Sequence, residues 1–142
     1  VDSRDHPQNY AGATSITPNI TEIEAALSLQ IGEDLAVLEE VGSRLLKEWS
    51  LKALLVTRGK LGMTLFTEDG VTPIPIHGSD EIADVTGAGD TVTATYSLAL
   101  AAGGSFEQAA RLANYAAGLV VMKKGTATVS SAELLDAVQR DG

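Results

Sequence analysis

The run Ala53-Leu54-Leu55-Val56-Thr57 constrains the fold of this chain more than any other stretch of its sequence. It is apolar without polar alternation up to its last residue, so a strand here buries both of its faces. Strands of this kind are central strands of a parallel sheet that helices cover on both sides. The sequence therefore predicts an α/β fold built around residues 53–57.

Other elements follow from apolar spacing, from glycine and proline positions and from residues that cap helices. Asn19 or Thr21 is expected to cap the first helix, and Ser105 with Gln108 is expected to form a capping box on a later one. Two prolines place the last strand at a sheet edge. Strands are expected over residues 12–17, 63–66 and 71–76, and helices over 22–29, 35–49, 91–102, 106–121 and a final segment ending near 138.

The composition excludes several classes of function. A formal net charge of −9 argues against nonspecific binding to nucleic acid or to a membrane surface. The chain has no cysteine, so it has no disulfide framework and no thiolate metal site, and two histidines are too few for a histidine-rich metal centre. A cytoplasmic protein is expected, because the sequence shows no signal peptide and no apolar run long enough to cross a bilayer.

Gly87-Ala88-Gly89 stands directly before an expected helix and is followed by Asp90. Glycines let the backbone approach a ligand, and the first N–H groups of a helix point outward at the positive end of its dipole. The stretch therefore predicts an anion hole, with the Asp90 carboxylate placed to take a proton from a substrate hydroxyl. Taken alone, the pattern is more often an ordinary helix start with a dipole-matched acid, and neither GxGxxG nor the Walker motif is present.

The longer stretch of residues 84–91, DVTGAGDT, resembles the C-terminal signature of the ribokinase-like (PfkB) carbohydrate kinases. The resemblance implies that Gly87, Ala88 and Gly89 form the anion hole. It also implies that Asp90 is the catalytic base and that Asp84 is a cation ligand; a strand-end turn residue is the alternative for Asp84.

The next residues point to one branch of that family. Thr95 departs from most members, which have Gly or Ala at this position. Residues 91–95, TVTAT, instead resemble the branch that phosphorylates heptose 7-phosphate in lipopolysaccharide precursor synthesis. The resemblance implies a sugar-phosphate substrate for this chain.

Asn19 and Glu22 match the family's Asn-x-x-Glu motif. In the family these two side chains help to position Mg²⁺ and phosphate, largely through water, and Mg²⁺ characteristically keeps several waters and takes few protein ligands. The alternative is purely structural, with Asn19 as a helix cap and Glu22 as a first-turn acid.

Thr57, Gly59 and Gly62 resemble the family's Thr-x-Gly-x-x-Gly segment, which implies contacts with the nucleotide phosphates. Ligands of α/β proteins generally lie at the carboxyl ends of parallel strands, where this segment is expected. The alternative is an ordinary hairpin turn, in which Arg58 and Lys60 are solvated charges.

Asn114 and Gly125 match the family segments that border the adenine. The resemblance implies that Asn114 lies close to the base and that the loop at Gly125 supplies carbonyl groups to a monovalent cation. Close packing of small residues is the alternative explanation for the Ala- and Gly-rich helix that carries Asn114.

The resemblance as a whole implies a ribokinase-like three-layer α/β/α fold, of which residues 1–142 are the ATP-binding C-terminal half, as a single domain or fragment, with a mostly parallel sheet and a hairpin. The resemblance also implies that the N-terminal sugar-binding half and its lid lie outside these residues. The expected activity is ATP-dependent phosphorylation of a sugar hydroxyl, with Mg²⁺ and a monovalent cation such as K⁺, and with a homodimer as one form of the full-length protein. The isolated chain is expected to be inactive.

Three alternatives stay open at this point. Another sugar or a nucleoside could be the acceptor. A vitamin-precursor kinase of the same superfamily often has a cysteine in the anion-hole motif, which this chain lacks. A noncatalytic nucleotide-binding module would have no need of a base at Asp90.

Overall fold

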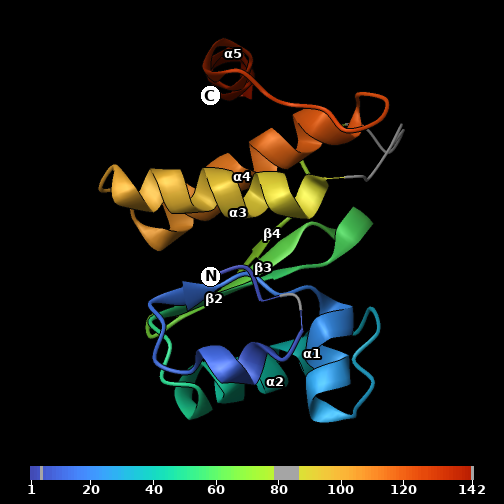
Figure 1. The fold of residues 1–142 in the computed structure, drawn as a ribbon, viewed down its shortest axis with the longest axis vertical. Helices are drawn as coiled ribbons and strands as arrows, with labels where there is room; N and C mark the ends of the chain where they lie inside the picture. Colours follow the sequence, from blue (N-terminus) through green and yellow to red (C-terminus); the bar gives the residue numbers. More distant parts are fainter. Residues whose placement is uncertain (4, 79–86, 142) are drawn as a thin grey trace. The chain divides into compact units, whose positions relative to one another are not determined.

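The computed structural model describes residues 1–3, 5–78 and 87–141, which Figure 1 traces in colour. The chain divides into two compact units, Val1–Pro75 and Ile76–Gly142. The first unit contains η1 (Pro7–Tyr10), β1 (Ser15–Ile16), α1 (Ile20–Leu27), α2 (Leu35–Glu48), β2 (Ala53–Thr57), η2 (Gly59–Leu61), β3 (Met63–Thr67) and β4 (Gly70–Ile74). The second contains α3 (Ala88–Ala101), α4 (Phe106–Val121) and α5 (Ser131–Asp141).

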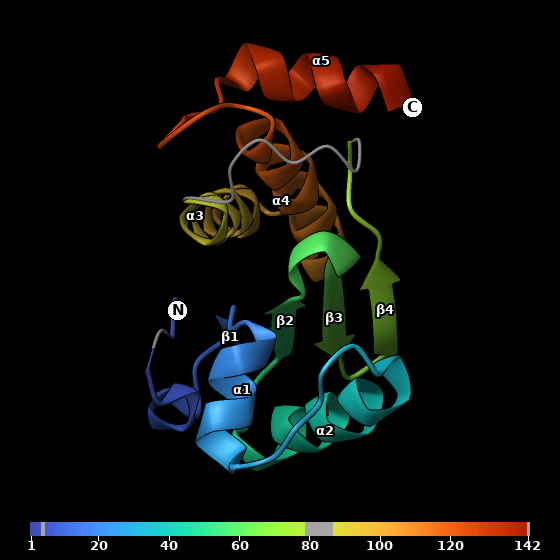
Figure 2. The same ribbon diagram turned by 90° about the vertical axis from the view of Figure 1, so that its right-hand side faces the viewer.

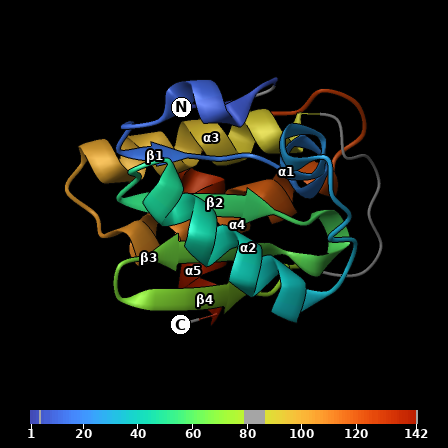
Figure 3. The ribbon, with the colours of Figure 1, turned by 90° about the horizontal axis from the view of Figure 1, so that it is seen from below.

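The strands of the first unit form one sheet in the order β1-β2-β3-β4 (Figure 3). β1 and β2 are parallel, whereas β2 with β3 and β3 with β4 are antiparallel. β2 spans the predicted residues 53–57, and β4, with its proline, lies at an edge of the described sheet. The α/β class and the hairpin are confirmed. The described sheet is mixed rather than mostly parallel, because the short turns at both ends of β3 permit only antiparallel pairing.

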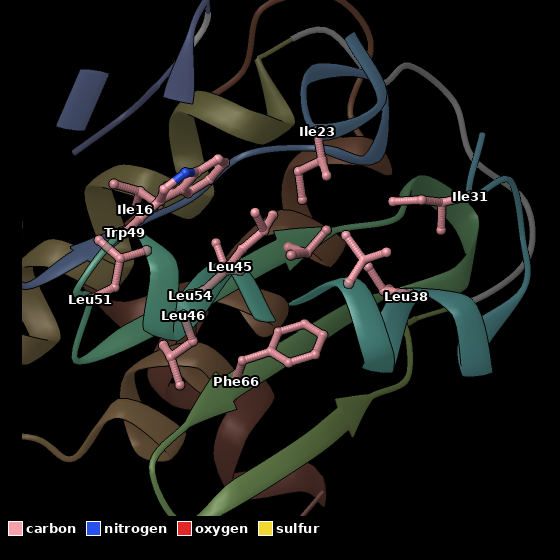
Figure 4. Close-up of a cluster of buried hydrophobic side chains, with 12 residues drawn as sticks. Ile16, Ile23, Ile31, Leu38, Leu45, Leu46, Trp49, Leu51, Leu54 and Phe66 are labelled. Atoms are coloured by element: carbon pink, nitrogen blue, oxygen red, sulfur yellow. The ribbon is translucent and has the colours of Figure 1, made fainter. Parts of the chain in front are cut away.

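The core of this unit lies between the sheet and the helices α1 and α2 (Figure 4). Leu54 and Val56 of β2 and Phe66 of β3 are fully buried there. The phenyl ring of Phe66 packs against Gly42 of α2, where a Cβ atom would stand 2.3 Å from the ring. The remaining buried members of the cluster are Ile16, Ile23, Ile31, Leu38, Val41, Leu45, Leu46, Trp49 and Leu51.

In the second unit, α4 packs against both α3 and α5 (Figure 2). The buried face of α4 consists mostly of small residues, Ala109, Ala110, Ala113, Ala116 and Gly118 among them. Small side chains let neighbouring backbones come close. Among the described residues, no helix is both long and apolar enough to cross a lipid bilayer.

His77 fastens the beginning of the second unit to the end of α5. Its Nδ1 atom lies 2.9 Å from Oδ2 of Asp141, and its ring centroid is 4.2 Å from that of Tyr115 on α4. Its carbonyl oxygen lies against Gly118, at 2.3 Å from where a Cβ atom would stand. α5 thus continues to Asp141, beyond the end predicted near residue 138.

Candidate active site

The start of α3 carries the predicted anion hole. Its N-cap, Gly87, has a φ angle of 79° and no side chain of its own to cap the helix. The first intrahelical bond of the described helix runs from the Thr91 N–H to the Gly87 carbonyl at 3.0 Å. The N–H groups of Ala88 and Gly89 therefore stand ahead of the helical ladder, at the end of a helix where anions bind.

Asp90 stands in the first turn of α3 and is exposed at the surface. No described atom lies within 4 Å of the position that a Cβ would take at Gly87 or Gly89. Around both positions, the described residues leave room for a ligand to approach the backbone. Asp84, the predicted cation ligand, lies outside the described residues.

The start of α1 carries the Asn-x-x-Glu motif, and the two side chains form a complete capping box. Asn19 Oδ1 accepts the Glu22 N–H at 2.8 Å, and Glu22 Oε2 accepts the Asn19 N–H at 2.9 Å. Asn19 and Glu22 therefore do cap the helix, as the structural alternative for this motif predicted. The oxygen atoms of these two side chains are also of the kind that Mg²⁺, a hard cation, prefers as ligands beside water.

A backbone contact joins this motif to the predicted phosphate turn. The Thr57 N–H donates to the Pro18 carbonyl at 3.0 Å, and Asn19 and Thr57 form a parallel β-bridge. The carboxyl ends of β1 and β2 thus bring Asn19, Glu22 and Thr57 to one edge of the sheet, where α/β proteins bind ligands.

The turn after β2 is closed by its own backbone. The Arg58 N–H donates to the Gly62 carbonyl at 2.8 Å, and the Gly62 N–H donates to the Gly59 carbonyl at 3.1 Å. Gly62, with φ 79° and ψ −132°, has a conformation that favours glycine. Gly59, with φ 57°, lies in the left-handed region that Ser28 and Ser50 also occupy.

The two cations of this turn both reach Glu33, in the loop between α1 and α2. Arg58 Nη2 donates to the Glu33 carbonyl at 3.1 Å, and Lys60 Nζ lies 3.4 Å from Glu33 Oε1. Glu24 holds the same loop, because its Oε1 accepts the N–H groups of Gly32 and Ile31, at 2.8 and 2.7 Å. These two hydrogen bonds, from Gly32 and then Ile31, lower the pKa of Glu24. Sequence reasoning missed Glu33, since no local spacing links it to Arg58.

Asn114 and Gly125 lie in the second unit. Asn114 is only 7% exposed and sits among the alanines of α4, as a buried polar side chain in an otherwise apolar face. Gly125 follows α4 with a φ angle of 70°. The predicted site residues thus fall into two groups: Asn19, Glu22, Thr57, Gly59 and Gly62 in the first unit, and Gly87, Ala88, Gly89, Asp90, Asn114 and Gly125 in the second.

Known structures with the same fold define the class of this protein. The ribokinase of Arabidopsis thaliana, solved with ribose and ATP, superposes with a TM-score of 0.82 at 26% identity over 94% of this chain and 43% of its own. Phosphofructokinase-2 of Escherichia coli, solved with potassium, gives a TM-score of 0.83 at 16% identity over 94% of this chain and 42% of its own. The predicted ribokinase-like fold is confirmed.

The chain belongs to the pfkB family of carbohydrate kinases, whose model matches residues 3–133. The bifunctional protein HldE of Chromohalobacter salexigens is 51% identical over 99% of this chain and 29% of its own length. The protein of the same name from Geobacter metallireducens is 52% identical over 89% of this chain and 26% of its own length. The chain therefore spans less than a third of the curated relatives that it matches.

Proposed function

We propose that the full-length protein transfers the γ-phosphoryl group of ATP to a sugar hydroxyl, and that the acceptor is C1 of D-glycero-D-manno-heptose 7-phosphate. The observation that carries the proposal is the start of α3, where the N-cap is a glycine and Asp90 stands in the first turn of the helix. Membership of the pfkB family supports the reaction class. The similarity to proteins named HldE and the TVTAT sequence at residues 91–95 support the heptose branch, which acts in the cytoplasm on lipopolysaccharide precursors.

In the proposed reaction, the Asp90 carboxylate takes the proton of the acceptor hydroxyl as its oxygen attacks the γ-phosphorus. The bond from the γ-phosphorus to the bridging oxygen breaks, and ADP leaves. The N–H groups of Ala88, Gly89 and Asp90 hold the oxygens of the phosphoryl group, where negative charge accumulates in transit. Each such donor is worth about 3 kcal/mol in comparable sites.

The other predicted residues bind the nucleotide in this proposal. Thr57, Gly59 and Gly62 contact its phosphates, and Asn114 lies beside the adenine. Asn19 and Glu22 hold Mg²⁺ through water, and the cation supplies charge neutralisation for the phosphates. Asp84 and the loop at Gly125 hold a monovalent cation.

The sugar itself is proposed to bind mainly to parts of the full-length protein other than residues 1–142. The motifs of this chain account for ATP, cations and the base, and none of its described residues is assigned to the heptose ring. We place the lid and the dimer contact in those other parts as well.

The substitution Asp90→Asn in the full-length protein tests the base. We expect turnover to fall roughly 10²–10⁴-fold, the usual contribution of a general base, while ATP affinity changes little. Turnover is measured by coupled ADP release with heptose 7-phosphate, and affinity by calorimetry. Glu107→Gln is the matched control, because Glu107 is also a first-turn acid, on α4, and pairs with Arg111 at 2.8 Å. Unchanged turnover in Asp90→Asn would remove the catalytic assignment.

A further inference from the structure

The loop between α4 and α5 is held by one lysine. Lys123, just after α4, donates from Nζ to the Thr128 carbonyl at 2.7 Å and to Oε1 of Glu133 at 2.8 Å. Between Thr126 and Val129, the Lys123–Thr128 contact is the one hydrogen bond that the described residues make. The ammonium group of Lys123 therefore ties this segment to the end of α4.

Glu133 keeps that ammonium group in place. Its second oxygen, Oε2, accepts the Ser130 N–H at 2.8 Å and the Ser130 hydroxyl at 2.9 Å, while Ser130 Oγ accepts the Glu133 N–H at 3.2 Å. One carboxylate thus caps α5 and binds Lys123 at the same time. This pairing is better ordered than an isolated surface ion pair, because the cap already fixes the carboxylate.

The helix that carries Glu133 is itself anchored at its far end. Asp141 pairs with His77, whose ring packs on Tyr115 of α4. Burial and then the neighbouring Asp141 carboxylate raise the pKa of Tyr115. Because α5 is fixed at both ends, Glu133 can hold Lys123, and through it the loop, against α4.

We propose that Lys123 and Glu133 are positioning residues that hold the loop of residues 125–129 in the shape required to bind the nucleotide. The inference rests on the proposed function, in which the loop at Gly125 holds a monovalent cation, and on the resemblance of this loop to the family segment that borders the adenine. Lys123 binds a loop carbonyl and does not touch the reacting atoms, so its loss weakens ATP binding and leaves the chemical step intact.

The variants distinguish the contacts of Lys123 with the loop and with Glu133 from the helix cap that Glu133 forms with Ser130. Glu133→Gln keeps an oxygen for the Ser130 N–H, since glutamine also completes a capping box, but it removes the charge that holds Lys123. Lys123→Met removes both contacts and keeps the apolar stem. Asp136→Asn is the control, because it breaks an i,i+4 ion pair with Arg140, 2.6 Å long, on the same helix away from the loop.

The experiment measures kcat and KM for ATP in the full-length protein, the Kd for ATP by calorimetry and hydrogen exchange of the 125–129 amides. In Lys123→Met we expect KM and Kd to rise about tenfold, the loss of one charge-assisted hydrogen bond, with kcat within about twofold. In Glu133→Gln we expect a smaller rise in KM and Kd, and in Asp136→Asn no rise. Hydrogen exchange of the 125–129 amides should become faster in Lys123→Met and Glu133→Gln only. Faster exchange with unchanged Kd, or unchanged exchange in both variants, overturns the proposal. If the unsubstituted protein phosphorylates no sugar, the proposed function fails. The Kd for ATP and the hydrogen exchange still test whether Lys123 and Glu133 position the loop.

Discussion

The helices α3 and α4 lie side by side in one unit and begin in opposite ways. At the start of α4, Ser105 Oγ accepts the Gln108 N–H at 3.2 Å, and Gln108 Oε1 accepts the Ser105 N–H at 2.9 Å. At the start of α3, the N-cap is Gly87, which has no side chain with which to cap the helix. Within the described residues, a pair of side chains thus caps α4, whereas the N-cap of α3 offers backbone alone.

The glycines of the two helices also differ, in how much space surrounds them. Gly87 and Gly89 of α3 have no described atom within 4 Å of a hypothetical Cβ, whereas Gly118 of α4 is in contact with the His77 carbonyl. Glycine in α4 serves close packing, and glycine in α3 serves an open surface. The contrast shows that a glycine or a helix start has to be judged by what surrounds it, and it motivates four tests.

The largest effect is expected from Gly87→Ala, which gives the start of α3 a side chain. With a φ angle of 79° at this position, alanine costs about 1–2 kcal/mol of unfolding free energy. The shifted N–H groups should lower turnover of the full-length protein by about 10²-fold, the cost of one lost oxyanion donor. Gly89→Ala is the companion variant: inside the helix it should stabilise by up to about 1 kcal/mol. Full turnover in Gly87→Ala would contradict an anion hole at this helix start.

Gly118→Ala tests packing in α4. A Cβ there would lie 2.3 Å from the His77 carbonyl, so the segment at His77 must move. Overpacking of this kind costs about 1–3 kcal/mol, which urea unfolding of this chain would detect. Ser97→Ala, at an exposed position of α3, is the control. An unchanged unfolding midpoint would mean that the contact yields without cost.

Ser105→Ala removes the cap of α4. We expect a loss of about 1 kcal/mol of unfolding free energy and no change in turnover per folded molecule. Urea unfolding and the coupled assay measure the two quantities. A selective loss of turnover would show that the start of α4 also contributes to the reaction, which would weaken the comparison with α3.

Acid should distinguish the cap of α5 from that of α4, because Glu133 titrates and Gln108 does not. The hydrogen bond from Lys123 and then those from Ser130 lower the pKa of Glu133 from 4.5 to about 2. The group binds fewer protons folded than unfolded, so its stabilisation is complete above pH 4.5 and is lost as the pH falls toward 2. The stability difference between the unsubstituted chain and Glu133→Gln, followed by urea unfolding, should therefore shrink over that interval. A constant difference would mean that Glu133 titrates normally.

Much of this fold could be predicted from local patterns. The apolar run of residues 53–57 predicted the bounds of β2, and Ser105 with Gln108 predicted the start of α4. Both predictions succeed because strand burial and helix caps depend on neighbours within a few residues. Residues 84–91 and Asn19-x-x-Glu22 indicated the family, which the comparisons confirm. The roles of the individual site residues stay predictions.

Other contacts had no signal in the sequence. Glu33 with Arg58 and Lys60, and His77 with Asp141, join residues far apart along the chain. Charged residues of this kind are usually solvated, so spacing alone assigns them no partner. The mixed sheet likewise depends on which strands pair, which an apolar run does not specify.

The hydrogen bond from the Thr57 N–H to the Pro18 carbonyl has a consequence for protein engineering. It makes the Asn-x-x-Glu segment and the predicted phosphate turn one structural part, although α2 and β2 stand between them in the chain. Grafting either segment alone onto another scaffold would leave a strand end without its partner. A graft that keeps the two segments together would have to include β1, β2 and everything between them.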